Sequence, residues 1–162
     1  MEHWPASVER VASVLRERGV HARLEEFPDG TPTARDAARA VGCELNQIVK
    51  SLVFVCDGLP VLALLPGDRR ADADKVARAA SAAYARVAKT EEVVAATGFE
   101  PGAVAPFPAE RVAIVLLERR LLLHEVVWAG AGSPRHMIGL APAELARAAR
   151  AVPADLAEAP PG

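Results

Sequence analysis

Apolar residues form two continuous runs in the first half of the chain, and these runs predict a β-hairpin. Residues 51–55 read SLVFV, and residues 60–65 read PVLALL. The turn between them contains Asp57-Gly58, a pair that readily adopts the positive φ angles of tight hairpins. A strand that is buried on both faces is typically apolar at every position, rather than at alternate positions. We therefore expect the rest of the chain to pack around this hairpin.

The pattern on either side of the hairpin predicts further helices and strands. Helical spacing, with Thr or Pro at several starts and Gly at several ends, predicts helices over residues 5–18, 33–42, 73–82, 90–98 and 142–150. Short apolar runs predict strands over residues 21–27, 111–117, 121–128 and 135–140. This irregular order favours a mixed α/β fold of the α+β class, with a mixed, mostly antiparallel sheet surrounded by helices.

The length of 162 residues suits one domain with a sizeable core. No internal repeat and no long linker divides the sequence. We expect a single domain over residues 1–162, with its core at about residues 20–155. Residues 156–162, which include two consecutive prolines, are expected to form a disordered tail.

Charge and composition exclude some classes of protein. The net charge of −2 argues against a global positive field for nucleic acid, but a small basic site for one RNA end stays open. A signal-peptide pattern is missing, and no apolar run reaches the ~18 residues of a membrane span, so we expect a cytoplasmic protein with no membrane partner. The histidines and cysteines show no HExxH or CxxC spacing and no Walker loop is present, so we expect no metal and no cofactor.

Three stretches contain residues that could do chemistry, and each also has an ordinary structural interpretation. Lys50 begins the first apolar strand, where it either extends to water or sits beside an anionic centre. Gly102, in the loop GFEPGAVAP, either lets the backbone approach a ligand or belongs to a rigid connection. Ser133 and His136, in AGAGSPRH, either bind a ligand or serve the fold.

Together these stretches resemble the YbaK/prolyl-tRNA synthetase-associated editing-domain family over about residues 33–155. The segments that carry the resemblance are QIVKSLVFVCDGLPVLALLPGDRRAD, AKTEEVVAATGFEPGAVAPF and VLLERRLLLHEVVWAGAGSPRHMIGLAPAEL. Their specific marks are the IVKS lysine, the TGFxxGxVxP loop and the late AGxxxxxIxL strand before a PxxL helix. The resemblance implies a barrel-like sheet and a trans-editing aminoacyl-tRNA deacylase. The implied substrate is a mischarged tRNA, often tRNA-Pro. The small residues of these motifs suggest that it carries a small non-cognate amino acid such as alanine, serine, cysteine or 2-aminobutyrate.

The resemblance also implies roles for individual residues. Lys50 is the residue most tied to activity in the family, and Gly102 lies beside the aminoacyl ester, so we expect both to be catalytic. Substrate contacts are expected from Ser51, Ala103, Pro106, Glu118, Gly130, Ser133 and His136. The expected partners are the aminoacylated acceptor end of tRNA and prolyl-tRNA synthetase, while no oligomeric state follows from the sequence.

Three positions depart from the family pattern and keep other functions open. Ala103 and Pro108 stand where the family commonly has glycine, and Glu118 stands where aspartate is usual. Such changes could narrow the pocket, so one alternative is a catalytically degenerate module that binds tRNA or a synthetase. Another is a small-molecule or nucleotide-ester hydrolase that uses the same pocket.

Overall fold

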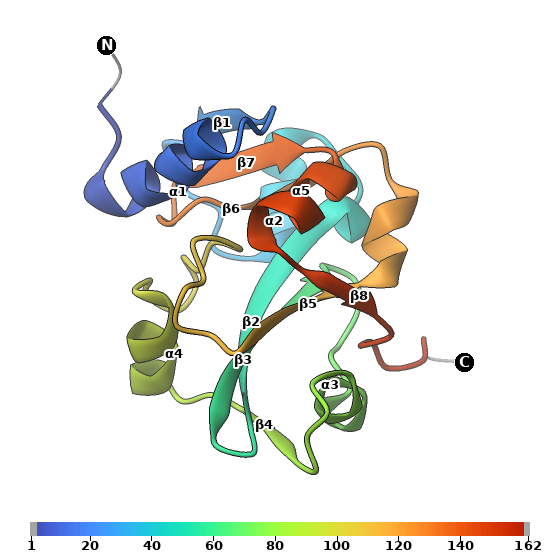
Figure 1. Cartoon of the computed structure of the whole chain (residues 1–162). Coiled ribbons are helices and arrows are strands. Elements are labelled where there is room, and N and C mark those ends of the chain that lie inside the picture. The colour runs from blue at the N-terminus through green and yellow to red at the C-terminus, as the bar shows by residue number, and fades with distance from the viewer. Residues whose placement is uncertain (1–2, 161–162) are drawn as a thin grey trace.

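A computed structural model describes residues 3–160 of the chain (Figure 1). Its α-helices are α1 (Ala6–Glu17), α2 (Ala34–Val41), α3 (Ala73–Ala79), α4 (Thr90–Thr97) and α5 (Pro142–Ala149). Its strands are β1 (Arg23–Glu26), β2 (Ile48–Cys56), β3 (Leu59–Pro66), β4 (Ala85–Val87), β5 (Ile114–Glu118), β6 (Val127–Gly130), β7 (His136–Leu140) and β8 (Val152–Ala154). Two short 3₁₀ helices are η1 (Leu45–Gln47) and η2 (Arg119–Leu123).

The strands form one mixed sheet in the order β1-β7-β6-β2-β3-β5-β8, with β4 beside one end of β2. The antiparallel pairs are β1–β7, β6–β7, β2–β3 and β2–β4. The parallel pairs are β2–β6, β3–β5 and β5–β8. This arrangement confirms the predicted mixed α/β fold with a mostly antiparallel sheet.

The β2–β3 hairpin is buried on both faces, as its apolar runs predict. Leu62 and Leu64 of β3 belong to an apolar cluster that includes residues of α1, α4 and α5. Val61, Ala63 and Leu65 alternate with them and belong to a second cluster, which includes residues of α3 and the C-terminal segment. In Figure 1, α4 and α3 accordingly lie on opposite sides of the hairpin. Two apolar layers therefore hold the hairpin at the centre of the molecule.

The turn of this hairpin has the predicted geometry and also anchors a strand that the sequence pattern did not predict. Asp57 and Gly58 both have positive φ angles, 48° and 84°. The Asp57 carboxylate accepts hydrogen bonds from the backbone N–H groups of Ala83 (2.9 Å) and Tyr84 (3.1 Å). These contacts lead directly into β4, which explains how so short a strand is held against β2.

The strand predicted over residues 121–128 is wrong, and the strand predicted over residues 111–117 begins only at Ile114. The chain instead turns through η2 and enters β6 at residue 127. The Glu118 carboxylate accepts a hydrogen bond from the backbone N–H of Arg120 at 2.7 Å, which favours a helical turn directly after β5. Leu121 is then fully buried, while the side chain of Leu123 is left 83% exposed.

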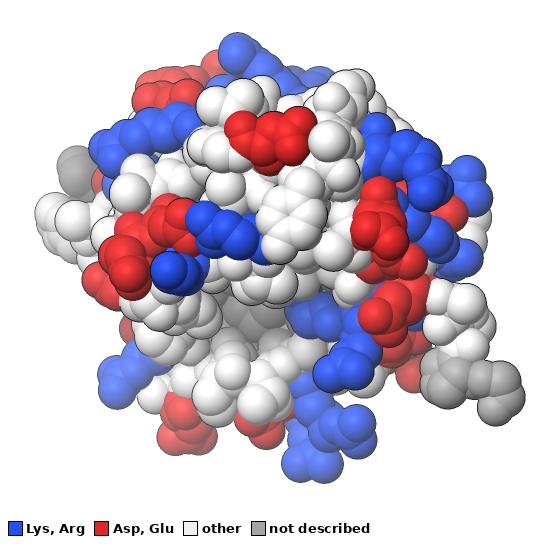
Figure 2. Space-filling model, turned by 90° about the horizontal axis from the view of Figure 1, so that it is seen from below, with Lys and Arg blue, Asp and Glu red and all other residues white. Residues whose placement is uncertain are grey.

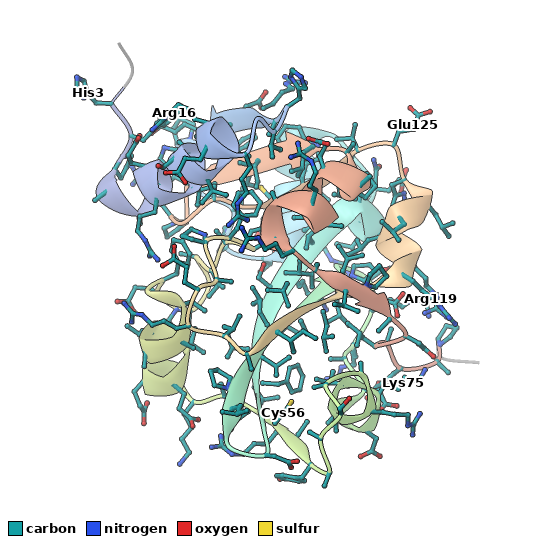
Figure 3. The ribbon with its side chains drawn as sticks, viewed as in Figure 1. His3, Arg16, Cys56, Lys75, Arg119 and Glu125 are labelled. Atoms are coloured by element: carbon teal, nitrogen blue, oxygen red, sulfur yellow. The ribbon has the colours of Figure 1, made fainter. Side chains whose placement is uncertain are left out.

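The limits predicted for the core and the tail are also wrong. Val8 and Val11 of α1 are fully buried, so the core begins well before residue 20. At the other end, Leu156 is fully buried and β8 pairs with β5. Figure 3 shows Lys75 of α3 beside this C-terminal segment, where its Nζ atom donates to the carbonyl oxygen of Ala157 at 2.8 Å. The last part of the predicted tail, residues 161–162, lies outside the described residues.

Two features of residues 3–160 concern membranes and metals. No helix in this range is both long enough and apolar enough to cross a membrane. Over the same range, no group of three or more His, Cys, Asp or Glu side chains is arranged to hold a metal ion.

Candidate functional site

A gap along one edge of β2 borders the cavity that most of the predicted site residues line. On this edge β6 pairs only with residues 48–49, and β4 pairs only with residues 54–56. The other edge is paired with β3 over residues 49–56. Residues 50–52 thus have a strand on one side and open space on the other, and a cavity of about 340 Å³ lies there.

Six residues that the sequence analysis assigned to the site line this cavity. They are Lys50, Ser51, Gly102, Gly130, Ser133 and His136. They come from three separate parts of the chain: β2, the loop after α4, and the β6–β7 connection with its adjoining strand ends. Apolar side chains, including those of Ile48, Val104 and Met137, fill the remaining wall. The fold therefore gathers these polar groups and backbone positions around one partly apolar space.

Lys50 is half-buried, and its ammonium group makes no ion pair with any side chain of residues 3–160. Its Nζ atom donates a hydrogen bond to the backbone carbonyl oxygen of Arg69. Burial lowers the pKa of Lys50, an effect that nearby Asp68 opposes and nearby Arg70 adds to. Because its bonded partner is a neutral carbonyl, the positive charge of Lys50 stays available to an anionic group in the cavity.

Ser51 and Gly102 offer two further points of contact. The Oγ atom of Ser51 is buried, and it has no hydrogen-bond partner within residues 3–160. A hydrogen bond from a ligand to such a buried, unpaired hydroxyl would stabilise the bound complex. Gly102 has a φ angle of +85°, and a Cβ atom built on it would meet no atom within 4 Å. Its backbone is therefore open to close approach from the cavity.

Ser133 and His136 form a hydrogen-bonded pair on the far wall. The Oγ atom of Ser133 lies 2.6 Å from Nδ1 of His136. The same Oγ atom accepts a hydrogen bond from the backbone N–H of Arg135 at 3.0 Å. His136 is only 4% exposed, and this burial is the main reason that its pKa is lowered. The imidazole is therefore neutral at neutral pH and able to accept a proton.

Three predicted contact residues, Ala103, Pro106 and Glu118, lie outside the cavity lining. Ala103 is buried, and its backbone N–H donates to the carbonyl oxygen of Glu100 at 2.9 Å. Pro106 is likewise buried in the loop. Glu118 is fully buried, and its Oε1 atom accepts from the backbone N–H groups of Leu156 (2.9 Å) and Ala157 (3.3 Å). The carboxylate of Glu118 anchors the C-terminal segment instead of contacting the cavity.

One wall of the cavity, the segment that enters α2, was not predicted from the sequence. Thr31, Pro32 and Thr33 line the cavity here. The sequence predicts a helix that begins at Thr33, and Thr33 does cap α2, because its Oγ1 atom accepts from the N–H of Asp36 at 3.0 Å. The segment lies against the β6–β7 connection through a bond from Thr31 N–H to the carbonyl of Pro134 at 2.9 Å. No spacing in the sequence signals this contact between distant segments.

Comparisons with known proteins show the family to which the chain belongs. The family model described as the aminoacyl-tRNA editing domain matches residues 29–148. The chain belongs to this family. Its fold is similar to the crystal structure of a candidate trans-editing enzyme for prolyl-tRNA synthetase, with a TM-score of 0.89 and 39% sequence identity. The similarity covers 97% of this chain and 100% of that one. The resemblance inferred from the sequence motifs is thus confirmed.

Curated relatives of this editing domain include both a short protein and a segment of a larger enzyme. The uncharacterized protein YwhH of Bacillus subtilis (strain 168) is 34% identical over 123 residues, which is 75% of this chain and 78% of YwhH. A proline–tRNA ligase of Nitratidesulfovibrio vulgaris (strain DP4) is 33% identical over 121 residues, or 73% of this chain. That match spans 21% of the ligase, so the chain is similar to only one part of that enzyme.

Proposed function

We propose that this editing domain is an aminoacyl-tRNA deacylase. It hydrolyses the ester between a small non-cognate amino acid and the 3′-terminal ribose of a tRNA, with tRNA-Pro as the carrier. The observation behind this proposal is that Lys50, Gly102 and His136, from distant parts of the chain, line one cavity of about 340 Å³. This volume is near the lower end of the roughly 300–1,000 Å³ found for ligand sites, so it suits an aminoacyl ester and its ribose.

Hydrolysis of the ester requires few groups beyond those that line the cavity. An aminoacyl ester is already activated, so the site has to orient the carbonyl and a water and to stabilise the developing negative oxygen. Lys50 provides a compact positive charge that is partly shielded from water. The open backbone at Gly102 and the unpartnered hydroxyl of Ser51 provide hydrogen-bonding groups for the ester or its ribose.

The choice of tRNA-Pro rests on similarity. Both the candidate trans-editing enzyme and the proline–tRNA ligase segment are related to prolyl-tRNA synthetase by their names.

Figure 2 shows positive and negative side chains interspersed on the face that it presents. The net charge of −2 suits a protein that binds only the acceptor end of a tRNA, rather than one that binds the whole tRNA body.

The position of Ala103 supports an enzyme over a degenerate binding module. The degenerate alternative rests on Ala103 and Pro108, which stand where the family commonly has glycine and could narrow the pocket. The Ala103 side chain is buried in the loop, outside the cavity lining, and Gly102 keeps the open position. The alanine therefore leaves the space beside Lys50 free.

The test is a deacylation assay with a panel of charged tRNAs. Transcripts of tRNA-Pro carrying alanine, serine, cysteine, 2-aminobutyrate or proline are incubated with the protein, and release of the amino acid is followed against spontaneous hydrolysis. We expect at least one small non-cognate ester to be hydrolysed and Pro-tRNA to be spared. Loss of the Lys50 charge in Lys50→Ala should slow the reaction by about 10²–10³-fold, the usual effect of removing one oxyanion-stabilising group.

A matched control separates the site charge from general charge effects. Lys89→Ala removes an exposed lysine at the start of α4, which does not line the cavity, and should leave the rate unchanged. Failure to hydrolyse any ester, together with equal binding of charged and uncharged tRNA, would identify a binding module instead. Equal activity on a free aminoacyl-adenosine would show that the tRNA body is not recognised.

A further inference from the structure

Strand register places a carboxylate opposite the buried histidine of the cavity. In the antiparallel pair β1–β7, Glu26 is the direct partner of His136. Directly opposed residues in such a pair point to the same face of the sheet. The Oε2 atom of Glu26 accordingly lies 3.5 Å from Nε2 of His136. This carboxylate does not line the cavity itself, so His136 stands between Glu26 and the substrate space.

The ring of His136 is therefore held from both ends. Its Nε2 atom faces Glu26, and its Nδ1 atom lies 2.6 Å from Ser133 Oγ. The Trp4 ring packs against the imidazole nearly at right angles, with 5.6 Å between the ring centroids. Burial and these contacts leave the ring little freedom to rotate, so each nitrogen keeps its partner.

The chemistry of the partners favours one arrangement of the protons. An ionised carboxylate can only accept a hydrogen bond, so the nearby Glu26 favours the tautomer of neutral His136 that carries its proton on Nε2. Nδ1 is then the acceptor, and Ser133 donates its hydroxyl proton to it. The backbone N–H of Arg135 already donates to Ser133 Oγ at 3.0 Å, which leaves one lone pair of this oxygen for a molecule in the cavity.

We propose that Ser133 and His136 relay the proton of the attacking water, and that Glu26 is the positioning residue that sets the histidine tautomer for this step. This inference rests on the proposed deacylase function. As the water oxygen bonds to the ester carbon, the water proton passes to Ser133 Oγ, and the serine proton passes to His136 Nδ1. When the ester C–O bond breaks, the proton returns by the same route to the leaving ribose oxygen. The products are a free amino acid and a ribose hydroxyl, with no redox change.

The charges around His136 affect its pKa and thereby the pH range in which the relay operates. Glu26 raises the pKa of His136, whereas burial, the largest effect, and Arg135 lower it. Glu25 and His3 line the neighbouring hollow on the side of Trp4, and Lys50 lies in the main cavity wall. Protonation of Nδ1 would remove the acceptor that Ser133 needs. The relay therefore works above the pKa of His136 and is lost as the pH falls through it.

The first test uses Glu26→Gln, which removes the negative charge and keeps the size of the side chain. Glu26 is 56% exposed, so the variant should fold normally. We expect kcat to fall about tenfold with KM unchanged, because the imidazolium formed in the reaction loses its partner. The acid limb of the pH–kcat profile should move to lower pH, because the charge that raised the pKa of His136 is gone. Ser133→Ala should lower kcat by about 10²-fold or more.

The matched control is Glu25→Gln, which removes the adjacent carboxylate. Glu25 pairs with Arg23 at 2.5 Å and faces Met137 in the strand register rather than His136. We expect kcat and its acid limb to stay as in the unsubstituted protein. If Glu26→Gln and Ser133→Ala also hydrolyse the ester at the original rate across the pH range, the relay is wrong while the deacylase function stands.

A second measurement does not depend on activity. Nitrogen-15 chemical shifts of His136 at neutral pH should report a protonated Nε2 and an unprotonated Nδ1, and Glu26→Gln should lower the fraction of this tautomer. Protonation at Nδ1 in the unsubstituted protein would overturn the relay. A protein that hydrolyses no charged tRNA contradicts both the deacylase function and the catalytic relay, and the shifts then decide separately whether Glu26 sets the tautomer.

Discussion

Lys50 and Arg69 are joined by a hydrogen bond from the lysine ammonium to the backbone carbonyl of the arginine, 19 positions further along the chain. A residue near the C-terminal end of the chain holds the segment that contains this carbonyl. The N–H of Glu158 donates to the carbonyl of Arg70 at 2.8 Å. The buried carboxylate of Glu118 accepts hydrogen bonds from the backbone N–H groups of Leu156 and Ala157, directly before Glu158. The position of Lys50 thus depends on a C-terminal segment that never reaches the cavity.

The first prediction concerns the alkaline side of the pH–rate profile. Burial lowers the pKa of Lys50, so its charge is lost at a lower pH than that of a free lysine. If the charged form stabilises the oxyanion, enzyme-dependent hydrolysis declines as the pH rises through this lowered pKa. Rates at alkaline pH, corrected for spontaneous ester hydrolysis, measure the decline. An enzyme-dependent rate that still rises beyond the pKa of an ordinary lysine would show that the ammonium is not required.

The second prediction concerns the backbone at Gly102. Gly102→Ala introduces a side chain at a φ angle of +85°, which costs about 1 kcal/mol of stability, and directs a methyl group into open space beside the cavity. We expect deacylation to fall by at least about tenfold as the ester is displaced. Thermal unfolding and initial rates measure the two effects separately.

The control for Gly102 is Gly58, in the turn of the β2–β3 hairpin. Its φ angle is +84°, and a Cβ atom there also meets nothing within 4 Å. Gly58→Ala should therefore cost similar stability and leave the rate unchanged. Equal activity in the two variants would mean that the substrate does not approach Gly102 closely.

The third prediction concerns the buried carboxylate of Glu118. Glu118→Ala removes the acceptor of the N–H groups of Arg120, Leu156 and Ala157 without replacing it. Buried donors left unpaired in this way should lower the free energy of unfolding by about 3 kcal/mol, as measured by urea denaturation. Glu118→Gln keeps one acceptor oxygen and should lose less. Equal stability of the alanine variant would show that the C-terminal segment is held by its apolar contacts alone.

The fourth prediction concerns the pH dependence of stability at the ion pair between β4 and α4. Arg86 donates to both carboxylate oxygens of Glu92 at 2.8 Å, and this lowers the pKa of Glu92 to about 2. Because the folded pKa lies below the unfolded one, the stabilisation is complete above about pH 4.5 and is lost as the pH falls toward 2. Glu92→Gln should lower Tm at pH 7, and the difference should shrink as the pH approaches 2.

The neighbouring carboxylate provides the control for this measurement. Glu91→Gln removes the same charge from the same first turn of α4, so it includes any effect of the helix dipole. We expect a smaller change in Tm than for Glu92→Gln. Equal changes in the two variants would assign the effect to the helix end rather than to Arg86.

Some elements of this fold could be predicted because local physics determines them. The Asp57-Gly58 turn, the apolar runs on either side of it and the Thr33 cap of α2 depend on residues close together in the chain. The strand predicted through Leu123 failed because a carboxylate that also serves the C-terminal backbone holds the next turn in a helical form. The predicted disordered tail failed because Leu156 is buried against distant elements.

The same distinction applies to the candidate site. Family motifs identified Lys50, Gly102 and the Ser133–His136 turn from the sequence, because close approach and charge restrict which residues can occupy such positions. The pairing of Glu26 with His136 depends instead on the register between β1 and β7, which start more than one hundred residues apart. Sequence spacing carries no record of such a register, because it is set by the packing of the whole sheet. The residue types of the site were thus determined locally, and only the tertiary structure decided which of them meet.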